Sequence, residues 1–342
     1  MLRTALLSVL GGGAILLSAS AASAATLRVP AQYATIQAAV DAAAPGDKIR
    51  VSRGEYCGAT LTKPVSLEGR GRPRIIGCAT SPMIAPGLRA GFFLPGTQGV
   101  NPASGSSIRG FVFDGKGVSN ANLSPLSFGV FARFASDVKV KRNRFIGTVQ
   151  AITNTAGDRW RIERNRIEQL TLFDCTLNCT GGDGIVLGHA TGARAVPGGS
   201  AAAGNRSEDN VIKHNIIGGT APDGFSAFSM VGVLLLSADG TRVHGNSLRL
   251  RDNPNAAAVG QGILVTNTCC GLASGYLPGS RNTRITHNDA RKSEVGIVVE
   301  GTGGTNTEGL VLRRNRGSLK LEDQPLIAAL RLIAPLRAQP QL

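Results

Sequence analysis

Aromatic residues are scarce in this chain of 342 residues, at 4% of the composition, and there is a single tryptophan. Proteins that bind single-stranded nucleic acid stack the bases on aromatic side chains, so this composition disfavours a nucleic-acid partner. Acidic residues are also few: 22 Asp and Glu stand against 37 Lys and Arg, and the formal net charge is +15. This excess points to an anionic partner, such as an acidic polysaccharide, lipopolysaccharide or membrane headgroups.

Long apolar runs are absent after the first residues. Arg3, the apolar run 5–17 and the sequence Ala22-Ser23-Ala24 have the order of a cleavable secretory signal. That run is too short to span a bilayer comfortably, and no other segment resembles a transmembrane anchor. We therefore expect a periplasmic or secreted monomer with a mature domain of 318 residues (342 minus 24).

What the chain does contain is a recurring phrase, apolar-x-apolar-x-x-Asn-x-apolar. Its Asn residues are Asn143, Asn165, Asn215, Asn246, Asn288 and Asn315, with Phe111 in the Asn place of an earlier copy. The alternation of period two predicts a strand with one face inward. We expect each Asn to form the bend after its strand, because Asn tolerates the left-handed conformation. Stacked coils would then let each Asn bond the next.

A second phrase, which begins with glycine, lies between the Asn phrases. Its copies start at Gly184, Gly232, Gly262 and Gly296, and Gly129 fits the same pattern. One strand after Gly, one before Asn and a short one after Asn make three strands per coil. This arrangement predicts an all-β parallel β-helix. A β-sandwich also has closely spaced strands, but it does not require one phrase to recur with Asn in register.

The N-terminal stretch has the pattern of a capping helix. An apolar stripe at helical spacing follows Thr35 and comprises Ile36, Ala39, Val40 and Ala43, before Pro45-Gly46-Asp47 ends the pattern. Such a cap would cover the open end of the solenoid. We expect a signal peptide over 1–24, the cap and first coils over 25–76, β-helix repeats over 77–317, and a C-terminal cap or tail over 318–342.

The opening VPAQYATIQAAVDAAAPGDKIRVSRGEYCG, followed by Val65-Ser66-Leu67-Glu68-Gly69, resembles that of right-handed parallel β-helix proteins of the pectin lyase-like superfamily. The resemblance covers about residues 26–317 and implies the fold. It implies no single activity, because this superfamily holds lyases, hydrolases, esterases, epimerases and proteins with no known reaction. The active-site patterns of its polygalacturonases, pectin methylesterases, mannuronan epimerases and pectate lyases are missing here, so no site residue is transferred.

Six cysteines in an exported chain suggest disulfides. Cys57 and Cys78 are 21 residues apart, about one coil, so we expect them to face each other. The other four lie in two inserted segments, as the pairs Cys175 with Cys179 and Cys269 with Cys270. Disulfides between these segments would join two long insertions. A metal site made by the four cysteines is the alternative, although adjacent cysteines suit tetrahedral zinc poorly.

The positions two and four before each Asn are expected to point outward. Most of them are basic: Arg109, Lys139, Lys141, Arg161, Lys213, Arg242, Arg284 and Arg313. Stacked coils would turn them into a ladder able to bind an acidic polysaccharide, and arginine is suited to bidentate contact with carboxylates. The alternative is a solvated face whose like charges only oppose aggregation.

Two hypotheses about function follow. In the first, the protein is a polysaccharide lyase, which cleaves by β-elimination at uronates, and Lys213, Arg242 and His244 supply the base and the charge stabilisation. Asp183 and His189, at the two ends of one Gly strand, form a second acid/base candidate, although roughly 20 Å of strand separates their Cα atoms. Calcium is left open as a cofactor.

In the second hypothesis, the protein is a non-catalytic exported binding or envelope scaffold. The central outward positions of the Gly strands favour this hypothesis, because they are apolar: Val186, Leu234, Leu264 and Val298. In pectate lyases and their relatives, the corresponding strand face and adjoining loops carry the catalytic groups.

Overall fold

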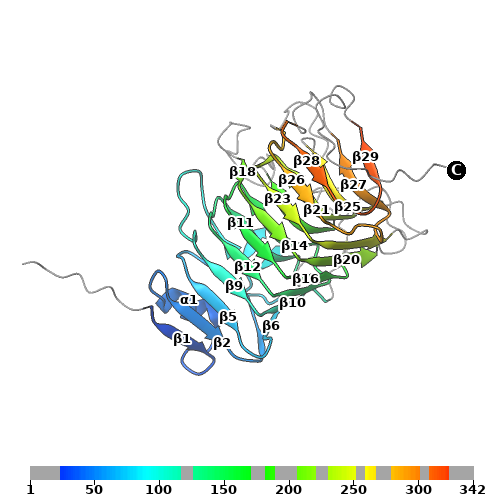
Figure 1. The fold of residues 1–342 in the computed structure, drawn as a ribbon. Coiled ribbons are helices and arrows are strands. Elements are labelled where there is room, and N and C mark those ends of the chain that lie inside the picture. The colour runs from blue at the N-terminus through cyan, green and yellow to red at the C-terminus, as the bar shows by residue number, and fades with distance from the viewer. Residues whose placement is uncertain are drawn as a thin grey trace, which may run out of the picture.

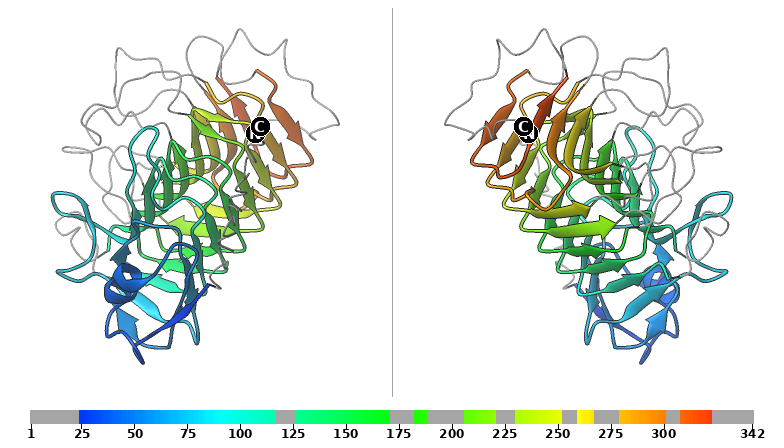
Figure 2. Two further views of the ribbon diagram at one scale, coloured as in Figure 1. Left: turned by 90° about the vertical axis from the view of Figure 1, so that its left-hand side faces the viewer. Right: turned by 90° about the vertical axis from the view of Figure 1, so that its right-hand side faces the viewer.

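We analysed a computed structural model of the chain. It describes residues 24–116, 126–170, 182–188, 206–220, 230–251, 259–266, 279–300 and 308–322. Within these ranges the chain winds through three parallel sheets, and each strand pairs with its counterpart one coil away. Figures 1 and 2 show the coils stacked from the blue N-terminal end to the red C-terminal end. The expected right-handed parallel β-helix is confirmed.

Sheet A includes, from its fifth strand onward, the strands that precede the ladder Asn residues. In spatial order its strands are β1 (Thr26–Val29), β2 (Lys48–Val51), β5 (Ser66–Gly69), β9 (Ser107–Arg109), β12 (Lys139–Lys141), β15 (Arg161–Glu163), β19 (Val211–Lys213), β23 (Arg242–His244), β26 (Arg284–Thr286) and β28 (Val311–Arg313). From β9 onward each has a buried apolar residue at its centre and outward side chains on both sides of it. The inward and outward assignment from the sequence is therefore correct.

Sheet B contains the short strands that mostly follow the bend. They are β3 (Glu55–Tyr56), β6 (Arg74–Ile76), β10 (Val112–Asp114), β13 (Arg144–Ile146), β16 (Arg166–Glu168), β20 (Ile216–Thr220) and β24 (Ser247–Arg251). Inside the solenoid, Phe113 of β10 and Phe145 of β13 stack with ring centroids 4.5 Å apart. The core is thus built coil upon coil.

Sheet C contains the Gly strands. They are β4 (Ala59–Thr60), β8 (Leu88–Leu94), β11 (Phe128–Arg133), β14 (Gln150–Thr155), β17 (Asp183–Gly188), β21 (Met230–Leu236), β25 (Gly260–Thr266), β27 (Val295–Val299) and β29 (Leu319–Leu321), with β7 (Met83–Ala85) antiparallel to β8. A separate pair joins β18 (Ser207–Glu208) to β22 (Ala238–Asp239). In the apolar column of this sheet, Val186, Leu264 and Val298 are buried and Leu234 is partly buried against them.

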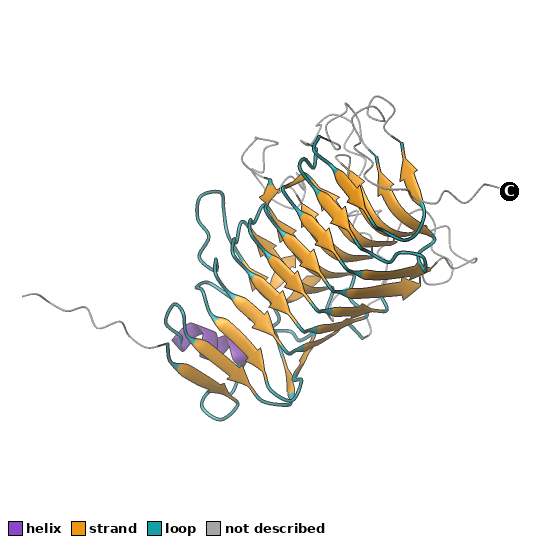
Figure 3. Cartoon of the chain, viewed as in Figure 1, coloured by secondary structure: helices purple, strands orange, loops and turns teal. Residues whose placement is uncertain are grey.

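The predicted capping helix is present as α1 (Ile36–Ala42), drawn in purple at the N-terminal end in Figure 3. The Thr35 hydroxyl accepts a hydrogen bond from the Ala38 backbone N–H, which satisfies one of the free donors of the first turn. Ile36, Ala39 and Val40 pack into the core. No helix in the described ranges has the length and apolar character that a membrane span needs.

The six Asn residues form a continuous internal ladder. The side-chain oxygen of Asn215, for example, accepts from the backbone N–H of Asn165 at 2.9 Å and from its side-chain amide at 3.1 Å. Asn215 in turn donates to the side-chain oxygen of Asn246 at 3.0 Å and to the Ile162 carbonyl at 3.0 Å. The Asn side chains therefore tie each coil to the next, as expected.

The bend itself is made by the residue before each Asn, which corrects the expectation that Asn would be left-handed. These residues have φ between 52° and 63°: Arg142, Arg164, His214, Gly245, His287 and Arg314. We call them the turn column. The physical reason is that a residue whose side chain points outward is free to adopt the strained left-handed backbone conformation. The Asn one residue later must point inward to bond its neighbours.

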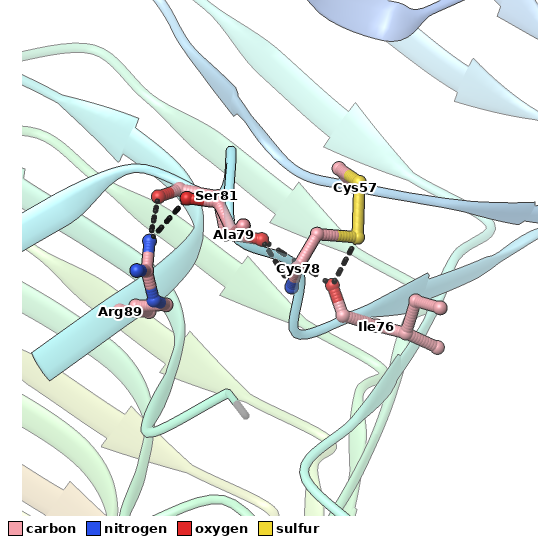
Figure 4. Close-up of a disulfide and its surroundings, with 6 residues drawn as sticks. All are labelled: Cys57, Ile76, Cys78, Ala79, Ser81 and Arg89. Carbon is pink, nitrogen blue, oxygen red and sulfur yellow. Dashed lines mark hydrogen bonds between the residues drawn. A yellow bond between two sulfur atoms is a disulfide. The ribbon is translucent and has the colours of Figure 1, made fainter. Parts of the chain in front are cut away.

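The disulfide between Cys57 and Cys78 is present, with the two Cα atoms 5.5 Å apart. Figure 4 shows it beside a turn in which Ser81 accepts a hydrogen bond from the Cys78 backbone N–H at 3.0 Å. Arg89 donates to the carbonyls of Ala79 and Ser81 in the same turn. A disulfide is typical of an oxidising compartment. Cys175, Cys179, Cys269 and Cys270 lie outside the described residues.

Candidate functional site

The outward side of sheet A carries a row of cations that spans seven coils. We call these residues the basic face: Arg109, Lys139, Lys141, Arg161, Lys213, Arg242, Arg284 and Arg313. Parallel pairing places Lys139 beside Arg161, and Arg242 beside Arg284. The structure therefore gathers all eight predicted polyanion-binding residues on one sheet.

Two acids interrupt the row, and both are buried. Glu163 lies between two lysines, 3.0 Å from Lys141 Nζ and 3.4 Å from Lys213 Nζ. Burial alone would raise the pKa of Glu163, but the hydrogen bonds and charges of these lysines outweigh it and lower that pKa. Glu163 is therefore ionised at neutral pH and neutralises part of the row from within.

Glu68 plays the same part near the N-terminal end. Its Oε1 atom lies 2.6 Å from both Arg109 and Arg70, and its Oε2 atom lies 3.5 Å from Arg50. Its side chain is only 6% exposed, so three arginines cover it. Arg109 is consequently less available to an external anion than the other cations.

Five cations of the basic face remain open. They are exposed, and none makes an ion pair with an acid among the described residues: Lys139, Arg161, Arg242, Arg284 and Arg313. The first four form one row on the first, second, fourth and fifth of five successive coils, with Val211 on the third, and Arg313 lies on the next coil. At the usual strand spacing this row is roughly 20 Å long.

The three catalytic candidates on sheet A do come together. Lys213 and His244 are register partners on adjacent strands, and Arg242 is two residues from His244 on the same face. His244 Nδ1 is 2.9 Å from Thr286 Oγ1. Burial, followed by the charges of His287, His214 and Lys213, lowers the pKa of His244 from its usual 6.5. His244 is therefore neutral at pH 7, whereas Lys213 is held by Glu163.

Asp183 is on sheet C, a different face of the solenoid, so it does not join that group. Its carboxyl is buried and accepts a hydrogen bond from Gln150 Nε2 at 3.3 Å, while Gln150 Oε1 accepts from Thr153 at 2.6 Å. Burial raises the pKa of Asp183 well above 3.8. Its proposed partner, His189, lies outside the described residues.

Sequence reasoning missed two residues beside His244. His214 and His287 belong to the turn column, and their ring centroids lie 5.6 Å and 5.0 Å from that of His244. The signal was present, because each of these three histidines lies one or two residues before a ladder Asn. The two turn residues follow the strand, so the alternation of period two assigns them to neither face.

Neither a family model nor a curated protein matches the chain. Solved structures resemble it at low identity. An alginate lyase from Paenibacillus sp. str. FPU-7 is 16% identical with a TM-score of 0.45, over 87% of this chain and 98% of that one. A pectin methylesterase in complex with a hexasaccharide is 10% identical with a TM-score of 0.44, over 89% and 94%.

The surface adhesin PfbA of Streptococcus pneumoniae is 14% identical with a TM-score of 0.40, over 83% of this chain and 87% of that chain. The function of this chain has to be argued from its own residues.

Calcium, which the sequence left open, has no evident site in the described part of the chain. No group of three His, Cys, Asp or Glu side chains there is placed to hold a metal ion.

Proposed function

We propose that this is an exported protein that binds an acidic polysaccharide along the basic face of sheet A. The proposal rests on a difference in exposure and ion pairing between the acids and the cations of this face. Glu68 and Glu163 are buried and paired, whereas Lys139, Arg161, Arg242 and Arg284 are exposed and unpaired by the described acids. The face therefore presents net positive charge outward.

The chemistry of a uronate polymer matches this surface. It carries carboxylates at regular intervals, and guanidinium groups bind carboxylates through two parallel hydrogen bonds. The stacked coils hold the backbone positions of the cations in a fixed row, so little backbone entropy of the protein is lost when an extended polymer binds. A row that meets several carboxylates at once gains affinity even though each exposed contact is weak.

The test compares two double variants in polygalacturonate binding by calorimetry at low salt. Arg242→Gln with Arg284→Gln removes two open cations of the basic face. Arg249→Gln with Arg251→Gln removes two exposed arginines of sheet B and is the matched control. Two exposed contacts are worth about 1.4 kcal/mol together, so the first variant should bind about tenfold more weakly. The control should bind as the wild type does.

Added salt should weaken wild-type binding, and neutral dextran should not bind. Equal losses in the two double variants would show that only net charge matters, and the basic face would then not be the binding surface. Dextran binding as tight as polygalacturonate binding would exclude a polyanion site altogether.

A second candidate function is β-elimination on the same polymer, favoured by the neutral His244 beside two cations. His244 would remove the proton on the carbon next to the uronate carboxylate, while Lys213 and Arg242 stabilise the charge that develops on that carboxylate. The glycosidic oxygen then leaves and takes up a proton, which creates a carbon–carbon double bond in the sugar.

The unsaturated product absorbs ultraviolet light, so the measurement is absorbance during incubation with polygalacturonate or alginate. The lyase hypothesis expects a rise that His244→Gln abolishes and that Arg249→Gln leaves unchanged. A wild-type protein that binds the polymer without any rise is a binding protein, and the lyase hypothesis is then wrong.

A further inference from the structure

Three of the four histidines in the chain meet on three successive coils. His214 follows β19, His244 ends β23, and His287 follows β26. The rings of His214 and His244 are nearly perpendicular, at 82° with centroids 5.6 Å apart, and His287 packs on His244 at 5.0 Å. We call these residues the histidine cluster.

Gly245 makes this packing possible. It occupies the turn column between His214 and His287, where other coils carry Arg or His. A Cβ atom at this position would lie 2.8 Å from His214 Nδ1 and 3.0 Å from its Cε1, so the His214 ring occupies the space of the missing side chain. The absence of that side chain lets His214 reach His244.

The groups that face the cluster are mostly cationic. Lys213 is the register partner of His244 on one side, with Glu163 bound to it, and Thr286 is the partner on the other side. Arg313 is in turn the partner of Thr286. Along the turn column, Arg164 precedes His214 and Arg314 follows His287.

The cluster also lies where the row of open cations on the basic face is interrupted. Four of the open cations form two pairs separated by the coil of Val211, and His214 follows the strand of that coil. Neutral histidines add no charge there, whereas protonated histidines would add positive charge between the two pairs. Protonation in a cationic setting is unfavourable by itself, and a bound polyanion would favour it.

We propose that the histidine cluster makes polyanion binding pH-dependent, so that the basic face binds an acidic polysaccharide more tightly in mildly acidic surroundings than at neutral pH. The proposal rests on the proposed function, since it concerns the same surface. It deepens that function by stating when the surface binds. The polymer and Glu163 stay ionised over the relevant range, because ordinary carboxyl pKa values are near 4 and that of Glu163 is lowered.

The experiment measures the affinity of the mature protein for sodium polygalacturonate at about pH 7.5 and about pH 5, on either side of the ordinary histidine pKa. Wild-type binding should be about tenfold tighter at the lower pH. His214→Gln with His244→Gln and His287→Gln should remove most of this change.

A variant with permanent charges tests the same idea in the opposite direction. His214→Arg and His287→Arg place in the turn column the residue that neighbouring coils already carry there, at Arg164 and Arg314. This variant should bind at pH 7.5 about fivefold more tightly than the wild type does at the same pH. Circular dichroism and urea unfolding check that both sets of variants keep the fold.

The outcomes separate the two proposals. Binding at pH 7.5 that does not tighten at pH 5 overturns the pH dependence and leaves the proposed function standing. A pH dependence that survives in the triple Gln variant also overturns it, and points instead to Asp158 and Glu208, whose pKa values burial raises. Binding at neither pH overturns both proposals.

Discussion

Lys213 Nζ lies 3.4 Å from Glu163 Oε1, on the neighbouring coil, and Lys141 holds the other oxygen of the same carboxylate at 3.0 Å. A single buried acid thus engages two of the lysines that would otherwise face a ligand. Glu163 therefore weakens the attraction of the basic face for external anions.

Replacing this acid should strengthen polyanion binding. Glu163→Gln keeps the shape of the side chain and frees two ammonium groups, each worth up to about 0.5 kcal/mol in an exposed contact. We expect polygalacturonate to bind about three- to fivefold more tightly in calorimetry. Asp41→Asn, at an exposed position of α1, changes net charge equally and is the control. An equal gain in affinity in both variants would contradict the view that Glu163 acts by engaging the two lysines.

The Asn ladder should carry much of the stability of the solenoid. Asn215→Ala removes buried side-chain bonds to Asn165, Asn246 and the Ile162 carbonyl, and leaves their partners unsatisfied. We expect a loss of about 2–4 kcal/mol in the free energy of unfolding in urea. Asn315→Ala, at the partly exposed end of the ladder, should cost about half as much. Equal losses of stability in the two variants would mean that the loss does not depend on how deeply the Asn is buried.

Asp183 should make stability depend on pH. Burial raises its pKa in the folded state, so folding favours the protonated form. The stability that this group contributes is complete below the unfolded-state pKa of about 3.9 and is lost as pH rises through the folded-state value. Asp183→Asn should therefore unfold at higher urea than the wild type at about pH 7.5, and the difference should shrink toward pH 4. A variant less stable than the wild type at pH 7.5 would contradict this account.

The Cys57–Cys78 disulfide should stabilise the N-terminal coils. A loop of 21 residues corresponds to about 3 kcal/mol of chain entropy in the unfolded state. Cys57→Ala with Cys78→Ala should lower the free energy of unfolding of these coils by up to that amount. The loss should stay local, because repeats in a solenoid are stabilised mainly by their neighbours. Hydrogen exchange of strands β2 and β5 should report the loss, with β23 and β26 as the internal control. Uniform loss along the chain would indicate a single cooperative unit.

Much of the fold follows from the sequence because each coil contacts only its neighbours. The phrase around Asn143 or Asn246 specifies an alternating strand, a bend and an inward amide, and stacking identical phrases leaves one arrangement in which every amide is bonded. The spacing of Cys57 and Cys78 was sufficient to predict their disulfide for the same reason, since one coil brings the two residues together. The N-cap at Thr35 is likewise a local feature.

The candidate site was predictable only in part. The sequence determined by itself which side chains leave the solenoid, because a period of two leaves no other choice, and so it identified the basic face. Only the tertiary structure decided which of those charges remain open. Glu163 satisfies two lysines, Gly245 admits the His214 ring, and Asp183 is enclosed on a different sheet. Those outcomes depend on side chains from coils 22 to 50 residues apart, whose pairing depends on the lengths of the segments between the coils and on no local pattern.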